Sequence, residues 1–459
     1  MAESKEPPPP YSPPPYSPTP LEEVSTPKKP VYKAVSHGDF ENLEDYAPGG
    51  YCPVVLGDKF VTESGTIRHI VLAKLGYGPS STVWLVKREA NTPPTISNPT
   101  NPSFHALKIL RAELSVRDKH NVIVPEQQPG YQMMRRLEQV GWRCHAHPNM
   151  IQIQSSFTRR SPNGQHCCYL LPLLGLSLDR CLNSLDGKQR HRICKQLAHV
   201  VNYLHTFAVC HGDLSPQHVL FRIPGAFDNL RLRREDDLDR FLGPHCSQRV
   251  EMADGSALSQ HAPRVVYEPA RFTGISMPAL RDVALVGFGK AFATFRTPPT
   301  LHCPIPIYPP EVLFGQPPST KSDIWQLGCL FFKIHTGSFP FLTQTSGLSL
   351  DSSYERLVWS AVQYLGPVPN SWKSQYRCDL YNDLIPPGQM DRQDLECWFD
   401  AEQPTKSLED RLKEAKHLGP KWKRNRIARL LSMMFAWEPS QRPSAGSVWR
   451  QLSDPPLEN

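Results

Sequence analysis

The sequence predicts an α+β protein in which strands form the N-terminal part and helices the C-terminal part. Residues 70–85 have the pattern of two strands around a glycine turn, and residues 105–110 form another alternating strand. The apolar run from Ile193 to Phe207 is helix-like. A polar loop with one carboxylate, Asp213, separates this helix from the β-rich run 219–223. Two buried elements would therefore hold one reactive side chain in place.

The composition is that of a globular chain. Its 459 residues are enough for two or three domains, and an apolar fraction of 39% allows a large core. No segment approaches the ~18 apolar residues that span a bilayer, and no secretory leader is visible. The twelve cysteines show no Cys-x-x-Cys spacing, which favours buried thiols over a metal site. We expect a cytoplasmic and/or nuclear protein without a membrane partner.

The net charge is +7, but the lysines and arginines do not form the pattern of a nucleic-acid-binding surface, since no run of them is interleaved with aromatic residues. We therefore expect no direct nucleic-acid partner. A basic body is nevertheless compatible with phosphate-rich ligands.

Residues 1–48 are rich in proline and nearly free of core-forming side chains, which predicts a disordered tail with polyproline II character. Two Pro-Pro-x-Tyr segments in it end at Tyr11 and Tyr16 and match the ligand pattern of WW domains. A WW-domain partner is one interpretation of these segments. Plain low complexity is the other.

Several motifs appear in an order that is typical of one enzyme family. They are Tyr46–Asp58 (Tyr-x-x-Gly-Gly-Tyr-x-Pro-Val-x-x-Gly-Asp), the glycine-rich turn Leu75–Trp84, the loop His211–Phe221, Ile307–Leu313, Ser322–Cys329 and Trp437–Pro443. Together they resemble the protein kinases and, from the first motif, the SR-protein kinase family. The resemblance covers most of the chain after residue 46. It implies a bilobal kinase fold with an N-lobe through the hinge at 49–174 and a C-lobe at 175–455, the latter carrying an insert at about 222–282.

The resemblance also implies an ATP site and a general base. Asp213 takes the place of the catalytic base, and Leu171 takes the place of the gatekeeper next to the hinge. Glu311 and Arg442 match the buried ion pair of the C-lobe. The residues that the resemblance places around ATP are Leu75, Gly76, Gly78, Val83, Lys108 and Leu173.

Lys108 is a lone charge in an apolar strand, and a lysine pointing to solvent would give the same pattern. As the ATP-binding lysine it would need a glutamate from the next helix, expected at 131–140. The position of that glutamate falls near Gly130. Gln132 and Glu126 are the alternatives.

Both metal-binding positions of the family pattern are altered. His218 replaces the asparagine of the catalytic loop, and Gly287 replaces the aspartate of Asp-Phe-Gly. A glycine side chain offers no ligand atom, and imidazole prefers softer divalent metals than Mg²⁺. Asp282 is five residues upstream, ~16 Å away along a strand, so it cannot serve the same metal. We therefore expect no convincing metal site.

Three functions remain open. The first is an ATP-binding serine/threonine kinase-like domain with impaired catalysis, a pseudokinase. The second is an active ATP-dependent serine/threonine kinase with an unusual metal arrangement. Its protein substrate is unknown, and the resemblance suggests a Ser/Arg-rich one. The third is an interaction scaffold that acts through the Pro-Pro-x-Tyr tail.

Overall fold

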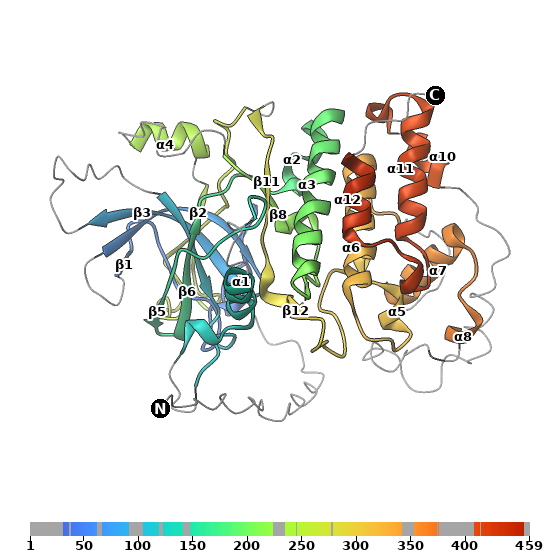
Figure 1. Ribbon diagram of the computed structural model, residues 1–459. Helices are drawn as coiled ribbons and strands as arrows, with labels where there is room; N and C mark the ends of the chain where they lie inside the picture. The colour runs from blue at the N-terminus through green and yellow to red at the C-terminus, as the bar shows by residue number, and fades with distance from the viewer. Residues whose placement is uncertain are drawn as a thin grey trace, which may run out of the picture.

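The computed structural model shows a β-sheet on one side of the molecule and a group of helices on the other (Figure 1). Both the α+β class and the predicted division into a strand-rich and a helical part are confirmed. None of the helices in the described ranges is both long and apolar enough to cross a bilayer. The structure describes residues 31–35, 38–61, 67–90, 104–118, 123–140, 147–223, 235–244, 246–276, 279–341, 353–373, 375, 408–413 and 415–453.

The strand-rich part is one antiparallel sheet with the strand order β1-β2-β3-β4-β6-β5. The alternation in the sequence gives the sheet two different faces. In β4, Leu107 and Ile109 are buried on one face, and Lys108 between them points to the other. The strands are β1 (Lys59–Val61), β2 (Ile67–Gly78), β3 (Ser81–Ala90), β4 (Phe104–Leu110), β5 (Ser155–Ser161) and β6 (Gly164–Pro172).

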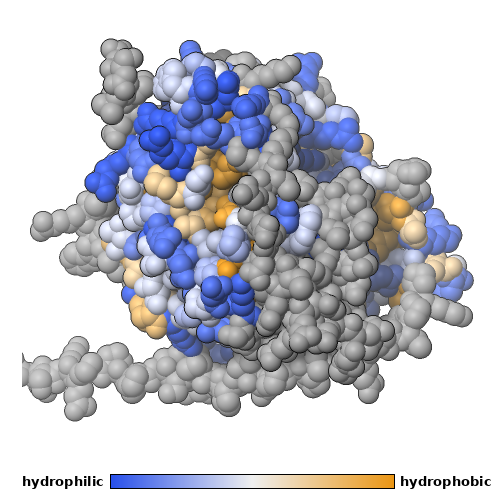
Figure 2. All heavy atoms as spheres, turned by 90° about the vertical axis from the view of Figure 1, so that its right-hand side faces the viewer, coloured by the Kyte–Doolittle hydropathy of each residue, from blue (hydrophilic) through white to orange (hydrophobic). Residues whose placement is uncertain are grey.

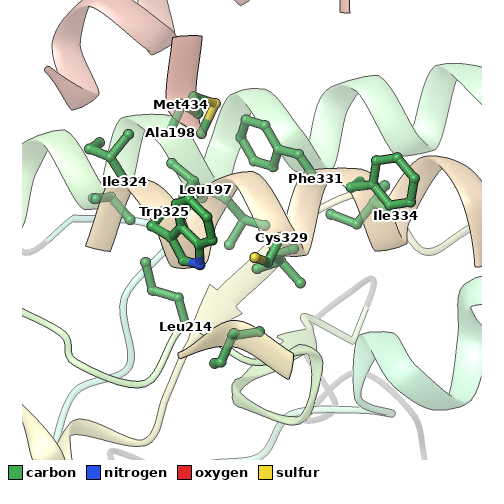
Figure 3. Close-up of a cluster of buried hydrophobic side chains, with 14 of the residues drawn as sticks. Leu197, Ala198, Leu214, Ile324, Trp325, Cys329, Phe331, Ile334 and Met434 are labelled. Atoms are coloured by element: carbon green, nitrogen blue, oxygen red, sulfur yellow. The ribbon is translucent and has the colours of Figure 1, made fainter. Parts of the chain in front are cut away.

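The helical part is organised around α6, which is buried along most of its length. Figure 3 shows side chains of α6 packed with Leu197 and Ala198 of α3 and Met434 of α11 on one side and Leu214 on the other. The helices are α1 (Pro129–Val140), α2 (Leu178–Cys181), α3 (Gly187–Thr206), α4 (Glu235–Leu242), α5 (Pro310–Leu313), α6 (Thr320–Thr336), α7 (Ser353–Leu365), α8 (Asn370–Lys373), α10 (Leu408–Lys413), α11 (Lys421–Met434) and α12 (Ala445–Ser453).

Local signals set the ends of the two central helices. Helix α3 starts at a capping box, in which the Asp186 carboxylate accepts a hydrogen bond from Gln189 N at 2.8 Å. Helix α6 ends at Gly337, whose φ of 84° is a left-handed conformation that glycine adopts without strain. The predicted helix 193–207 is thus the apolar half of a longer one.

Short strands frame the loop that holds Asp213. They are β7 (Val209–Cys210), β8 (Val219–Phe221), β11 (Val283–Leu285) and β12 (Phe292–Ala293). Strand β8 pairs with β11 and β7 pairs with β12, both antiparallel. The predicted insert therefore leaves the fold after one strand and returns at its paired neighbour.

The described parts of the insert pack against the sheet. Leu238 and Phe241 of α4 and Phe272 share an apolar cluster with Ala73 and Leu85 of the sheet. Figure 1 shows α4 above β2 and β3. A hairpin of β9 (Ser247–Arg249) and β10 (Val265–Tyr267) follows α4. A segment predicted as part of the C-lobe thus covers the N-terminal sheet.

The predicted end of the disordered tail at residue 48 needs correction. Residues 31–35 and 38–48 are ordered, with a short 3-10 helix at Leu43–Asp45. Tyr32, Leu43 and Tyr46 are buried against Val250 and Val266 of the insert, among others. Their partners lie about 200 residues away, so a count of core-forming residues within the tail does not reveal them. Tyr11 and Tyr16 lie outside the described residues.

The predicted ion pair of the C-lobe is confirmed. The Arg442 guanidinium donates to both carboxylate oxygens of Glu311, at 2.9 and 2.8 Å, and both side chains are at most 1% exposed. Ser322 Oγ donates a further bond of 2.7 Å to Glu311. The pair thereby fastens α5 to α6 and to the segment before α12.

We predict that Glu311→Gln lowers the free energy of unfolding by about 3–5 kcal/mol, because it leaves a buried guanidinium without its counter-charge. Urea denaturation followed by circular dichroism measures this loss. Lys33→Ala is the control, since the Lys33–Glu251 pair has both side chains more than half exposed (57% and 58%) and should contribute nothing measurable. Equal losses in the two variants would contradict the prediction.

Candidate active site

Side chains of α6 hold the loop that carries Asp213 by hydrogen bonds to its backbone. The Asp323 carboxylate accepts hydrogen bonds from the backbone N–H groups of His211 and Gly212, at 2.8 and 2.9 Å. Gln326 accepts a third, from Leu214 N at 3.0 Å. Charge-assisted bonds to a rigid buried helix fix the path of the loop. Leu214 also packs in the apolar cluster of α3 and α6 (Figure 3).

The sequence reasoning did not assign this anchoring role to Asp323 and Gln326. A signal for it exists, because they are polar residues inside the apolar motif Ser322–Cys329. Both are at most 1% exposed, and a buried carboxylate needs hydrogen-bond donors.

Asp213 lies where the sequence predicts a general base. Its side chain is almost buried, with 8% of the residue exposed. Oδ1 has no hydrogen-bond partner among the described residues, and Oδ2 lies 3.5 Å from Nδ1 of His218. One oxygen of a fixed carboxylate is therefore available to accept a proton or a hydrogen bond.

Gly212, which replaces the arginine of the kinase pattern, has a steric reason to be glycine. Its φ is +75°, and a Cβ at this position would lie 2.9 Å from the carbonyl oxygen of Lys290. The close approach of the backbone at Lys290, just before β12, leaves no space for a side chain.

Gly287 and His218 are in direct contact, and each explains the other. A Cβ on Gly287 would lie only 2.4 Å from Cδ2 of the His218 ring. The imidazole thus occupies the space that a side chain at 287 needs. His218 Nδ1 is turned the other way, 3.0 Å from the carbonyl oxygen of Asp213 and 3.2 Å from Ser215 Oγ. The two replacements are 69 positions apart in the sequence, and the structure packs them against each other.

The residues present do not fit the magnesium site of a kinase. Mg²⁺ takes oxygen ligands in octahedral geometry, whereas Gly287 has no side-chain ligand and His218 offers a nitrogen. The part of the chain that the structure describes holds no group of three or more His, Cys, Asp or Glu residues suited to a metal. Asp282 is directed elsewhere, with its Oδ1 accepting hydrogen bonds from Arg192 and Gln196 of α3.

The sheet brings three of the residues predicted around ATP into one row. Gly76 on β2 is opposite Val83 on β3, and Val83 is opposite Lys108 on β4. Gly78 ends β2 at the turn into β3. The register of three antiparallel strands thus places the glycine-rich hairpin beside the lysine.

Burial of the Lys108 side chain removes solvation from its ammonium group, and this lowers the pKa of Lys108.

Two of the residues predicted around ATP are in contact with the insert. Leu75 and Leu173 pack against the apolar cluster of α4 and Phe272. Leu171, the predicted gatekeeper, instead packs against the clusters of the C-lobe and of Tyr169. The surroundings of these two residues therefore include the insert as well as the hinge.

No carboxylate pairs with Lys108 within the described ranges. Gln132, one alternative from the sequence, is exposed on α1, and the side chain of Glu126 lies outside the described residues. Gly130 is pressed against the chain at Phe288, since a Cβ there would lie 3.0 Å from the Phe288 carbonyl oxygen. Close packing of α1 on this segment thus leaves little space for a glutamate at 130.

The segment 38–51, which we call the N-terminal brace, ties the glycine-rich hairpin to its surroundings. Tyr51 Oη donates to the carbonyl oxygen of Gly78 at 2.9 Å, and Tyr77 Oη donates to Asp39 Oδ1 at 2.6 Å. Asp39 Oδ2 lies 3.9 Å from the guanidinium of Arg180 on α2. Asp39 therefore links the hairpin to helix α2 of the helical part. The sequence indicated none of these contacts.

We predict that the double variant Asp39→Ala/Tyr51→Phe speeds amide hydrogen exchange in residues 75–84, because the hairpin loses the hydrogen bonds from Tyr77 Oη and from Tyr51 Oη. Exchange followed by mass spectrometry measures this. Asp254→Ala is the matched control, since the Asp254 carboxylate only accepts a hydrogen bond from Ser256 N within its own exposed turn. Unchanged exchange at 75–84 in the double variant would show that the brace does not hold the hairpin.

Comparisons with known proteins agree with this geometry. A family model described as the lipopolysaccharide kinase (Kdo/WaaP) family matches residues 175–235. The chain is 25% identical over 358 residues to the serine/threonine-protein kinase SRPK of Physarum polycephalum, covering 72% of this chain and 74% of that protein. It is 30% identical over 206 residues to protein kinase dsk1 of Schizosaccharomyces pombe, covering 43% and 33%.

The chain is 27% identical over 216 residues to SRSF protein kinase 3 of Homo sapiens, and the match covers 44% of this chain and 34% of that protein. The chain thus matches about a third of the length of dsk1 and of this kinase. A solved kinase domain matches with a TM-score of 0.51 and 17% identity, covering 87% of this chain and 97% of that one, which shows the fold. The chain has a protein-kinase fold and is a homologue of the SRPK-type serine/threonine kinases.

Proposed function

We propose that this chain is an SR-protein-kinase-like serine/threonine kinase domain that binds ATP but transfers phosphate weakly or not at all. The observation that carries the proposal is the contact between His218 and Gly287, in which an imidazole fills the place of a metal-binding side chain. Phosphoryl transfer depends on positioning and on neutralising the charge of the phosphates. The metal ligands are the part of that machinery which the chain lacks.

Support for ATP binding comes from the residues that remain. The kinase homologues imply a nucleotide ligand. The row of Gly76, Val83 and Lys108 supplies an open backbone, an apolar contact and one cation. Because no carboxylate holds Lys108 within the described part of the chain, the ammonium is available to an anionic phosphate. ATP bound in this way would depend on Lys108 rather than on Mg²⁺.

We predict that ATP raises the melting temperature of the purified protein equally with and without Mg²⁺ or Mn²⁺. Lys108→Ala should abolish the shift, because it removes the charge that meets the phosphates. Lys59→Ala, at an exposed position of β1 in the same sheet, is the matched control and should keep it. A thermal-shift titration measures all three proteins. A shift that appears only with metal would refute the proposed metal-independent binding.

An active kinase with an unusual metal arrangement is the second candidate, and the state of Asp213 favours it. The carboxylate is in place and Oδ1 is unpaired among the described residues, as a general base requires. One relative is named SRSF protein kinase 3, so Ser/Arg-rich peptides are the substrates to test first. Phosphate transfer that is lost in Asp213→Asn would establish this candidate. No transfer with Mg²⁺ or Mn²⁺ would eliminate it.

The WW-domain interaction of the tail also remains a proposal. It concerns Tyr11 and Tyr16, which lie outside the described residues, and rests on the two Pro-Pro-x-Tyr segments alone. Capture by a WW domain that survives Tyr11→Ala/Tyr16→Ala would refute it.

A further inference from the structure

A cavity of about 740 Å³ lies in the helical part, between the start of α3, the start of α11 and the end of α12. Helix α3 has 20 residues, so it is ~30 Å long, and its other end leads to β7 and the loop of Asp213. The cavity is therefore well separated from the loop of Asp213. Its volume is within the range of about 300–1,000 Å³ that small-molecule sites occupy.

The wall of the cavity is largely apolar. Leu418, Ile427, Leu430 and Leu452 line it. Trp422 also lines it and is 48% exposed, which is unusual for so large an apolar side chain. Figure 2 faces the side of the molecule that carries these helices and shows apolar residues gathered among hydrophilic ones. A ligand with an apolar body would bury this surface.

Cations outnumber anions among the lining residues. Lys188, Lys423 and Arg426 line the cavity together with a single acid, Asp186, whose carboxylate is occupied in capping α3. Neither Lys188 nor Lys423 forms an ion pair within the described ranges. Two lysines with exposed side chains are thus available to an anionic group at the edge of an apolar cavity.

Three histidines also line the cavity, His191 on α3, His335 on α6 and His417, and the rings of His335 and His417 are stacked at 5.7 Å. Burial lowers the pKa of His335 to about 3, helped by the nearby His417 and Arg190. Burial likewise lowers the pKa of His417. Both rings are therefore neutral near pH 7 and do not oppose an apolar chain. His335 Nδ1 and His417 Nε2 are buried and lack a hydrogen-bond partner among the described residues, as expected of a site that a bound molecule completes.

We infer that this cavity binds an amphipathic carboxylate, with the apolar chain against Ile427, Leu430 and Leu452 and the carboxylate at Lys188 and Lys423. Apolar burial supplies affinity, and the two ammonium groups select an acid over a neutral molecule of the same shape. This site is independent of nucleotide binding.

The test is isothermal titration of the full chain with dodecanoate below its micelle concentration. We expect saturable binding of one molecule, weaker binding of dodecanol and no binding of butanoate, since both the charge and the chain are needed. Lys188→Ala/Lys423→Ala should bind dodecanoate roughly tenfold more weakly. Lys421→Ala, an exposed lysine on the same helix that does not line the cavity, should bind normally.

Ile427→Trp provides a second variant, because its larger side chain would fill the space for the apolar chain. Circular dichroism verifies that each variant is folded. Absence of dodecanoate binding to the wild type would overturn the inference, as would equal binding by the wild type, the double lysine variant and Ile427→Trp. Binding only to vesicles that contain dodecanoate would also overturn it and would indicate a membrane-surface contact instead.

Discussion

The structure of the active-site region depends on one buried carboxylate, that of Asp323. It receives the backbone N–H groups of His211 and Gly212 and lies 3.0 Å from Nε2 of His205. Because α6 is surrounded by core, this anchor does not move with the side chains of the loop. The loop therefore keeps a kinase-like path and presents Asp213, although neighbouring positions of the family pattern have changed.

Around that anchor the chain is closely packed at three glycines and at the imidazole of His218. A Cβ would collide at Gly212 and at Gly287, and Gly130 is packed almost as closely against the chain at Phe288. Close packing has little tolerance for an added group, so these positions constrain one another. The replaced kinase residues are thus a connected change in packing.

The sequence predicted the fold well because its signals are local. Strand alternation, helix caps and ordered motifs each lie within a few residues, and the Glu311–Arg442 pair followed from two such motifs. The sequence did not reveal contacts between distant segments. The order of residues 38–48 arises from their packing on the insert, and the link from Asp39 to Tyr77 requires the folded chain. Side-chain contacts of this kind leave no periodicity.

The most direct test compares ATP affinity with and without Mg²⁺ in the wild type, Gly287→Asp and His218→Asn/Gly287→Asp. We predict no effect of Mg²⁺ on the wild type and a destabilised Gly287→Asp, whose Cβ meets the imidazole. In the double variant the smaller asparagine makes space, and aspartate tolerates a left-handed backbone better than most residues. Mg²⁺ should then strengthen ATP binding. A wild type whose ATP affinity already rises with Mg²⁺ as much as that of the double variant would contradict this view.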